Sequence, residues 1–174
     1  EELSAALTAD AQKVQFVGVA GTAGKTAAAG LLAAILREAA FHVGFYRAGC
    51  EPLSARIAIG GVSVDPVLLC QAAEALSAAK PLPREAAELA AAARCFGAAG
   101  CRLAVVELPD AGLASALPNM PVCAVTAIGP DGVSRSVERL AALAAGVMRK
   151  DAVCVTAPEQ PKAVLSELVV AAAK

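Results

Sequence analysis

One short segment limits the folds open to this chain more than any other: the glycine-rich loop Gly21-Thr22-Ala23-Gly24-Lys25-Thr26. The apolar run from Val14 to Ala20 precedes it, and a pattern rich in alanine and leucine follows from Lys25 to Ala39. A buried strand, a tight turn and a helix in this order form the setting that a phosphate-binding loop requires. The segment therefore predicts an α/β domain with an anion site at the start of its first long helix.

The residue types in this loop suit a nucleotide triphosphate. Glycines let the backbone curl so that successive N–H groups converge on phosphate oxygens, and the helix N-terminus adds about half a positive charge. Lys25 supplies a full charge for the β- and γ-phosphates, and the Thr26 hydroxyl can ligate Mg²⁺. We therefore expect a nucleotide site formed by Gly21, Thr22, Ala23, Gly24, Lys25 and Thr26, with Thr26 as a ligand of Mg²⁺.

The loop is shorter than the general pattern GxxxxGK[ST], which would place a glycine where this chain has Val19. The alternative interpretation is a glycine-rich turn between a strand and a helix, with an incidental lysine. Because the strand, loop and helix patterns agree with one another, the sequence favours the phosphate site.

Strand and helix patterns alternate along the rest of the chain. Near-continuous apolar strands followed by helices indicate a P-loop-type, mostly parallel sheet with helices on both faces. Gly60-Gly61 lies between two alternating runs and predicts one β-hairpin insertion over residues 56–64. We expect a single domain over residues 1–174, with strands over 14–20, 43–47, 102–108, 122–128 and 152–156, and helices over 25–39, 66–79, 84–99, 134–148 and 161–173.

Composition argues against several classes of protein. Hydrophobic residues make up 57% of the chain, but much of this is alanine, and charged residues or glycine interrupt each apolar stretch before the length of a spanning helix. The net charge of −1 gives no electrostatic reason to bind nucleic acid or an anionic membrane. The acidic start Glu1-Glu2 is unlike a signal peptide. We expect a cytoplasmic protein that binds neither nucleic acid nor membrane.

The cysteines give no sign of a zinc site or a disulfide framework. They are scattered without a CxxC pair, and His42 is the single histidine of the sequence. Small buried thiols in a reducing compartment are the expected state of Cys50, Cys70, Cys95, Cys101, Cys123 and Cys154.

Motifs along nearly the whole chain resemble those of one family. The segment VAGTAGK, residues 19–25, is similar to the VAGTNGK loop of folylpolyglutamate synthases, in the Mur ligase superfamily. Further matches follow in the family's order: residues 43–46 with its VGLY strand, 56–61 with its ERIxING hairpin, 103–107 with LAVLEVG, 127–131 with SIGLDH, 145–147 with KAGI and 156–160 with TAPQ. Together these matches are far more specific than the loop alone.

The resemblance implies an ATP-dependent C–N ligase. In that family a substrate carboxylate attacks the γ-phosphate of ATP, and an amine then displaces phosphate from the acyl phosphate to form an amide. Matched by position, Lys25 would contact the phosphates, and Thr26 and Glu107 would hold or orient the first Mg²⁺. Glu107 also ends a predicted parallel strand, where a carboxylate lies beside a nucleotide crevice. The alternative for Glu107 is a solvated charge at a strand end.

Several positions depart from the family pattern. Residues 48–51 (AGCE) replace the family's SPHL, Gly132 replaces a histidine, and Ala23 replaces the asparagine of the loop. Ala144 stands where the family has a lysine that is carbamylated to bind a second metal. Together these changes remove most ligands of the second metal. We therefore expect the chain to be catalytically degenerate, or incomplete on its own.

Length adds to this expectation. Family members continue into a C-terminal domain that closes over the site, and nothing in this sequence corresponds to it. We therefore expect a separate closing domain or a partner protein. Two alternatives stay open: an active ligase fragment or subunit of a split folylpolyglutamate synthase-like enzyme, and an unrelated P-loop kinase or NTPase. Against the second alternative, the sequence shows neither the NKxD-type guanine motif of a GTPase nor the arginine-rich lid of a small-molecule kinase. Weaker site candidates are Asp110 and Asp131, as metal ligands, and Arg47.

Overall fold

The computed structural model describes residues 5–78, 81–109, 111–130, 136–150 and 152–173, which form one seven-stranded sheet with helices around it. The strands are β1 Gln15–Ala20, β2 Val43–Tyr46, β3 Ile57–Ile59, β4 Val62–Ser63, β5 Leu103–Glu107, β6 Val122–Val125 and β7 Val153–Thr156. The helices are α2 Ala9–Gln12, α3 Lys25–Glu38, α4 Leu53–Arg56, α5 Pro66–Ser77, α6 Arg84–Ala98, the 3₁₀ helix η1 Ala111–Ala116, α7 Val137–Ala145 and α8 Lys162–Ala172. Within these ranges no helix is both long enough and apolar enough to cross a membrane.

Most of the sheet is parallel. The strand order is β4-β3-β2-β5-β1-β6-β7, and β2, β5, β1, β6 and β7 pair in parallel. β3 and β4 add an antiparallel hairpin beyond β2. Gly60 and Gly61 form its turn with φ of 60° and 86°, values that residues with a Cβ rarely adopt. The predicted α/β architecture, a mostly parallel sheet with one hairpin insertion, is confirmed.

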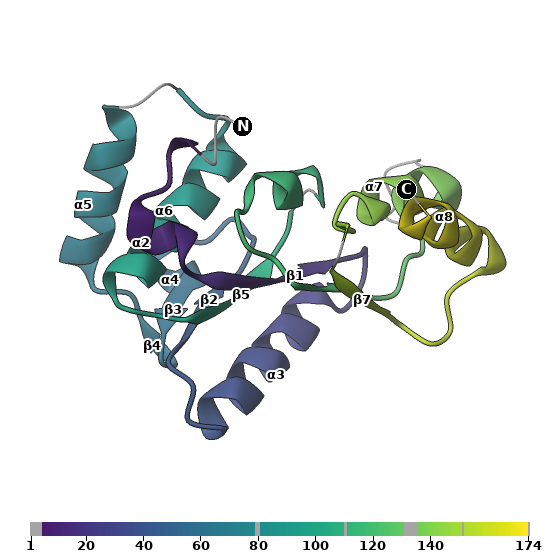
Figure 1. Ribbon diagram of the computed structural model, residues 1–174, viewed down its shortest axis with the longest axis horizontal. Coiled ribbons are helices and arrows are strands. Elements are labelled where there is room, and N and C mark those ends of the chain that lie inside the picture. Colours follow the sequence, from purple (N-terminus) through teal and green to yellow (C-terminus); the bar gives the residue numbers. More distant parts are fainter. Residues whose placement is uncertain (1–4, 79–80, 110, 131–135, 151, 174) are drawn as a thin grey trace.

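Helices cover the two faces of the sheet unequally (Figure 1). On one face α3 packs against β1, β2 and β5, and there Val105 of β5 joins a small buried cluster. On the other face lie α2, α5, α6, η1, α7 and α8, over a larger cluster that contains Ala104 and Val106. Successive residues of β5 belong to different clusters because side chains along a strand point to opposite faces in turn. Helices on both faces were predicted, and this is confirmed.

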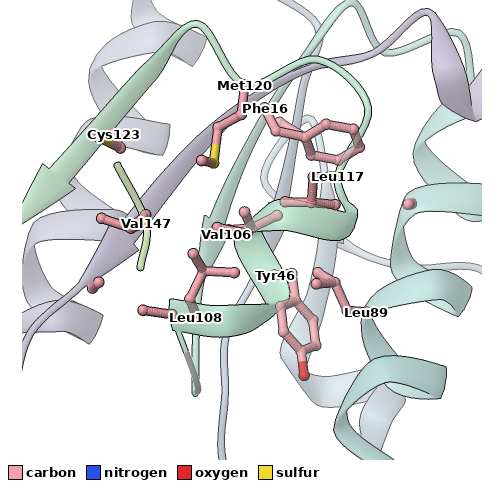
Figure 2. Packing of buried hydrophobic residues seen from close by; sticks show 14 of the residues in the cluster. Phe16, Tyr46, Leu89, Val106, Leu108, Leu117, Met120, Cys123 and Val147 are labelled. Carbon is pink, nitrogen blue, oxygen red and sulfur yellow. The ribbon is translucent and has the colours of Figure 1, made fainter. Parts of the chain in front are cut away.

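The larger cluster packs directly on the backbone of β1. Figure 2 shows Phe16 of β1 beside Leu117, with Met120 above the same strand. A Cβ added to Gly18 would lie 2.6 Å from the Met120 sulfur, closer than atoms can approach. Glycine at this strand position therefore lets the segment that follows η1 lie close against the sheet.

The strand order creates a crevice next to the loop after β1. The connection from β1 through α3 leads to β2 on one side, whereas the connection from β5 through η1 crosses β1 to reach β6 on the other. These two connections leave the sheet on opposite faces. At such a switch point the carboxyl ends of adjacent parallel strands open a crevice for ligands. Here the crevice lies between β1 and β5.

Some element boundaries differ from expectation. α4 and η1 are unpredicted, because such short turns carry no hydrophobic period of their own. β6 ends at Val125 rather than Ile128, since Ala127 bonds to the loop after β1 and Ile128 bonds to Gln160. The helix expected from Ser134 begins at Val137, where the Ser136 side chain caps it.

The expected burial of the thiols is correct for Cys95, Cys101 and Cys123. Burial raises the pKa of Cys95 and that of Cys101 to about 11, so both stay protonated at neutral pH. The expectation is wrong for Cys50 and Cys70, which are exposed. Cys70 lies on the solvent side of α5, where helical periodicity leaves small apolar residues outside the core.

Candidate nucleotide-binding site

Glycine conformations shape the loop between β1 and α3. Gly21 and Gly24 have φ of 131° and 79°, a region that other residues rarely adopt. Gly24 is the N-cap residue of α3, and no side chain caps the first turn of this helix. The N–H groups at the start of α3 therefore lack an intrahelical acceptor, and together with the helix dipole they favour an anion.

Lys25 folds back over the loop. Its ammonium group donates a hydrogen bond to the Gly21 carbonyl, with 3.0 Å between Nζ and O. This contact keeps a full positive charge on the loop itself, one residue after the N-cap of α3. The charge and the uncapped N–H groups therefore occupy the same place, which is the combination that binds phosphate.

Glu107 reaches the same place from the neighbouring strand. The parallel register of β1 and β5 sets Glu107 opposite Val19. The Thr26 hydroxyl then lies 3.1 Å from Oε1 and 3.0 Å from Oε2 of the carboxylate. Glu107 is 5% exposed, so it is not the solvated strand-end charge of the alternative interpretation. Residues 81 positions apart thus converge at the carboxyl edge of the sheet.

The segment after β6 supports the loop from the side. The Ala127 carbonyl accepts hydrogen bonds from the N–H groups of Thr22 and Ala23, each at 3.1 Å. A Cβ on Gly21 would lie 2.2 Å from the Thr126 hydroxyl oxygen, so glycine is needed for this close approach. The expectation that successive loop N–H groups converge on one ligand is therefore not met at Thr22 and Ala23, whose N–H groups bond to Ala127. The N–H groups at the start of α3 stay open to an anion.

A pocket of about 380 Å³ adjoins the loop. The loop and Lys25 form one wall of it. The other wall is apolar and consists of Leu108, Pro109, Ala111, Leu140, Leu143 and Ala144. Position 144 therefore lines the same pocket as the loop, but its alanine offers no ligand to a metal.

The residues at the loop fit one Mg²⁺. Thr26 and Glu107 bring together a hydroxyl and a carboxylate, the hard oxygen donors that this ion prefers. In the described part of the chain, no group of three or more His, Cys, Asp or Glu side chains could hold a metal by itself. Three positions named from the sequence lie outside the described residues: the candidate ligands Asp110 and Asp131, and Gly132, which replaces a family histidine.

Arg47 is engaged within its own segment. Its guanidinium lies 3.1 Å from the carboxylate of Glu51, so its charge is paired there. Behind this pair, Arg56 donates hydrogen bonds to the carbonyls of Glu51 and Arg47 and is 2% exposed. These contacts hold the segment after β2, which contains residues 48–51, where the sequence differs from the family's SPHL. Sequence reasoning missed this role of Arg56, because a basic residue at the start of a hairpin motif gives no sign of burial.

Gln160 is a second buried polar residue that sequence reasoning missed as part of the site. It is 7% exposed and bonds to the segment after β6. Its signals in the sequence are its place in the segment that resembles TAPQ, residues 156–160, and a long polar side chain just before Pro161, the N-cap of the next helix.

Comparisons with known proteins identify the fold. No protein-family model and no curated protein matches the sequence. A Mycobacterium tuberculosis folylpolyglutamate synthase complexed with ADP and AMPPCP is 21% identical, with a TM-score of 0.84 over 99% of this chain and 43% of that one. Folylpolyglutamate synthetase from Lactobacillus casei is 22% identical, with a TM-score of 0.83 over 98% and 44%. E. coli FolC in complex with DHPP and ADP is 20% identical, with a TM-score of 0.84 over 99% and 43%. The chain spans less than half the length of these proteins, and over that span it has the fold of folylpolyglutamate synthase.

Proposed function

We propose that this chain binds ATP together with Mg²⁺ at the loop over residues 21–26. The observation that carries the proposal is the Thr26–Glu107 contact, which lies beside Lys25 at a helix start without a side-chain cap. A triphosphate supplies the negative charge that this arrangement favours. Two of the similar structures are complexes with ADP, one of them also with AMPPCP, which supports an adenine nucleotide.

Each residue then has a distinct role. Lys25 leaves the Gly21 carbonyl and bonds to β- and γ-phosphate oxygens, because a bond between two charged groups is the stronger one. Thr26 and Glu107 would hold Mg²⁺, which would supply positive charge beside the phosphate oxygens. Gly24 keeps the helix start free of a side chain, so that phosphate oxygens can approach the N–H groups.

We further propose that the chain is the nucleotide-binding domain of an ATP-dependent C–N ligase similar to folylpolyglutamate synthase, and that it is catalytically incomplete by itself. The fold and the ordered motifs support this reaction class. Ala144 supports the incompleteness, because it lines the same pocket as the loop and stands where the resemblance implies a lysine that binds the second metal. Closure over the site and exclusion of water would then depend on a further domain or a partner protein.

Isothermal titration calorimetry with Mg-ATP tests nucleotide binding. We expect a high-micromolar dissociation constant, because only Lys25 and one metal ion would neutralise the charge of the phosphates. Lys25→Ala should abolish the heat of binding, since it removes the full charge on the loop. Lys13→Ala is the matched control, because this lysine is exposed and pairs with Asp10. The Lys13→Ala variant should bind Mg-ATP as tightly as the unsubstituted chain does. Equal affinity of Lys25→Ala and Lys13→Ala would reject the site.

A phosphate-release assay tests the catalytic part of the proposal. We expect no ATP turnover by this chain alone that depends on a pteroate and glutamate. Ala144→Lys combined with Gly132→His should not restore turnover, because a metal ligand does not replace the closure that excludes water. Steady phosphate release that requires both substrates would contradict incompleteness and favour an active ligase fragment or subunit.

A further inference from the structure

Gln160 joins three chain segments at the carboxyl edge of the sheet. It lies between β7 and α8 and is 7% exposed. Its Oε1 accepts a hydrogen bond from the Ile128 N–H at 3.1 Å. Its Nε2 donates to the Thr126 carbonyl at 2.8 Å and to the Thr156 hydroxyl at 3.2 Å. The bond to Ile128 is costly to remove, because its N–H is buried and would lose its acceptor.

The side chain of Gln160 bonds to a segment that has left the geometry of β6. The backbone ladder between β6 and β7 ends with the pairing of Val125 and Thr156. The Val125 carbonyl faces the β7 side, where it accepts the Ala157 N–H, and in a regular strand the next carbonyl would point the other way. The Thr126 carbonyl instead bonds to the amide of Gln160, so the chain departs from the strand geometry at Thr126.

The two bonds of Gln160 fix the direction of the residue between them. The Ala127 carbonyl and the Ile128 N–H belong to one trans peptide and point in opposite directions, so the bond of Ile128 to Gln160 turns the Ala127 carbonyl away from Gln160. With the Thr126 carbonyl turned to Gln160, the Ala127 carbonyl faces β1 and accepts the N–H groups of Thr22 and Ala23. The hydroxyl of Thr22 also donates to it at 3.2 Å. One carbonyl thus receives three hydrogen bonds from the phosphate loop.

We propose that Gln160 is a positioning residue for the phosphate loop: it orients the Ala127 carbonyl, which holds the loop in the shape that leaves the start of α3 open to phosphate. This inference rests on the proposed nucleotide binding. Gln160 lies on the far side of the 126–128 segment from the loop and acts through that segment alone.

Gln160→Met tests the inference, because it keeps the length of the side chain and removes both hydrogen-bonding ends. Two quantities are measured: amide hydrogen exchange at Thr22 and Ala23 by NMR, and affinity for Mg-ATP by calorimetry. We expect exchange at both amides to accelerate at least about tenfold and the affinity to fall about tenfold, the effect of roughly one to two hydrogen bonds. Asp65→Ala is the matched control, since it removes one capping bond, to Val67, next to the opposite edge of the sheet and should change neither quantity.

The outcomes are separable. Unchanged exchange at Thr22 and Ala23, or unchanged affinity where the parent chain binds Mg-ATP, overturns the role of Gln160. If the parent chain does not bind Mg-ATP, the proposed function fails, and the exchange rates alone decide whether Gln160 holds the loop. If Gln160→Met does not fold, Gln160→Glu at pH 8 replaces it, because its carboxylate accepts from Ile128 but cannot donate to Thr126. The same acceleration at Thr22 and Ala23 is then expected.

Discussion

Arg56 is less exposed than any other charged residue that the structure describes. Its guanidinium lies 2.9 Å from the Glu88 carboxylate, and Arg84 bonds to the same carboxylate from the solvent side, also at 2.9 Å. Burial opposes ionisation of Glu88, but hydrogen bonds and charges from Arg84 and Arg56 outweigh it and lower the pKa of Glu88. Glu88 therefore forms ion pairs with one buried and one exposed arginine, and these two pairs should contribute differently to the free energy of unfolding.

Glu88→Ala should lower the free energy of unfolding by about 3 kcal/mol, because it leaves the Arg56 charge buried without its partner. Arg84→Ala is the matched control and should cost less than about 1 kcal/mol, since its side chain is 75% exposed. Urea unfolding measures both variants. Equal losses would show that Arg56 is held by its other contacts, to Glu51, Arg47 and Tyr46.

The sequence predicts those residues of the site whose role follows from their place in the chain. Lys25 and Thr26 stand at a helix start after a glycine-rich turn, and Glu107 ends an apolar strand. Gln160 and Arg56 could not be predicted in this way. Gln160 acts through partners such as Ile128, which is 32 residues away in the sequence. The role of Arg56 depends on its burial, which no local pattern reveals.

β2 and α6 lie closer together than a side chain on β2 would allow. A Cβ on Gly44 would lie 2.5 Å from the ring of Phe96, which is fully buried. By contrast, a Cβ on Gly30 of α3 would meet nothing within 4 Å. The two glycines therefore differ in purpose: Gly44 makes room for packing, whereas Gly30 only lowers the helix propensity of α3.

Gly44→Ala should destabilise the fold by about 2 kcal/mol, because Phe96 or the strand must move to admit the methyl group. Gly30→Ala should instead stabilise it by up to about 1 kcal/mol, since alanine favours the helix and the space is open. Thermal or urea unfolding compares the two. A loss in both variants, or in neither, would contradict the packing described for β2 and α6.

Elements were easier to predict than their ends. The apolar runs and the Gly60-Gly61 turn predict the type of the strands and most helices, because periodicity is a local property. β6 ends earlier than its apolar run, since Ala127 and Gly129 bond to the loop over residues 21–26 and Ile128 bonds to Gln160 instead of continuing the sheet. An apolar pattern records that a residue is buried and does not record which backbone groups it pairs with.

The order of the strands in the whole molecule lay beyond the sequence patterns. Parallel pairing of β1 with β5 sets Val19 opposite Glu107, and the two connections leave the sheet on opposite faces. Strand patterns predict that such a sheet forms, but not which distant strands become neighbours. The crevice between β1 and β5, and with it the meeting of Thr26 and Glu107, follows from this order. A single domain over residues 1–174 stays a prediction.

The central claim, that the loop over residues 21–26 binds a Mg-nucleotide in the folded chain, is tested most directly by the thermal unfolding midpoint. A ligand at about 100 times its dissociation constant stabilises the folded state by roughly 2.7 kcal/mol. For a chain of 174 residues, each kcal/mol moves the midpoint by about 2–4 °C, so saturating Mg-ATP should raise it by roughly 5–10 °C. Lys25→Ala should lose this shift while its midpoint without ligand stays nearly unchanged. No shift at several millimolar Mg-ATP, or an equal shift in Lys25→Ala, would contradict the claim.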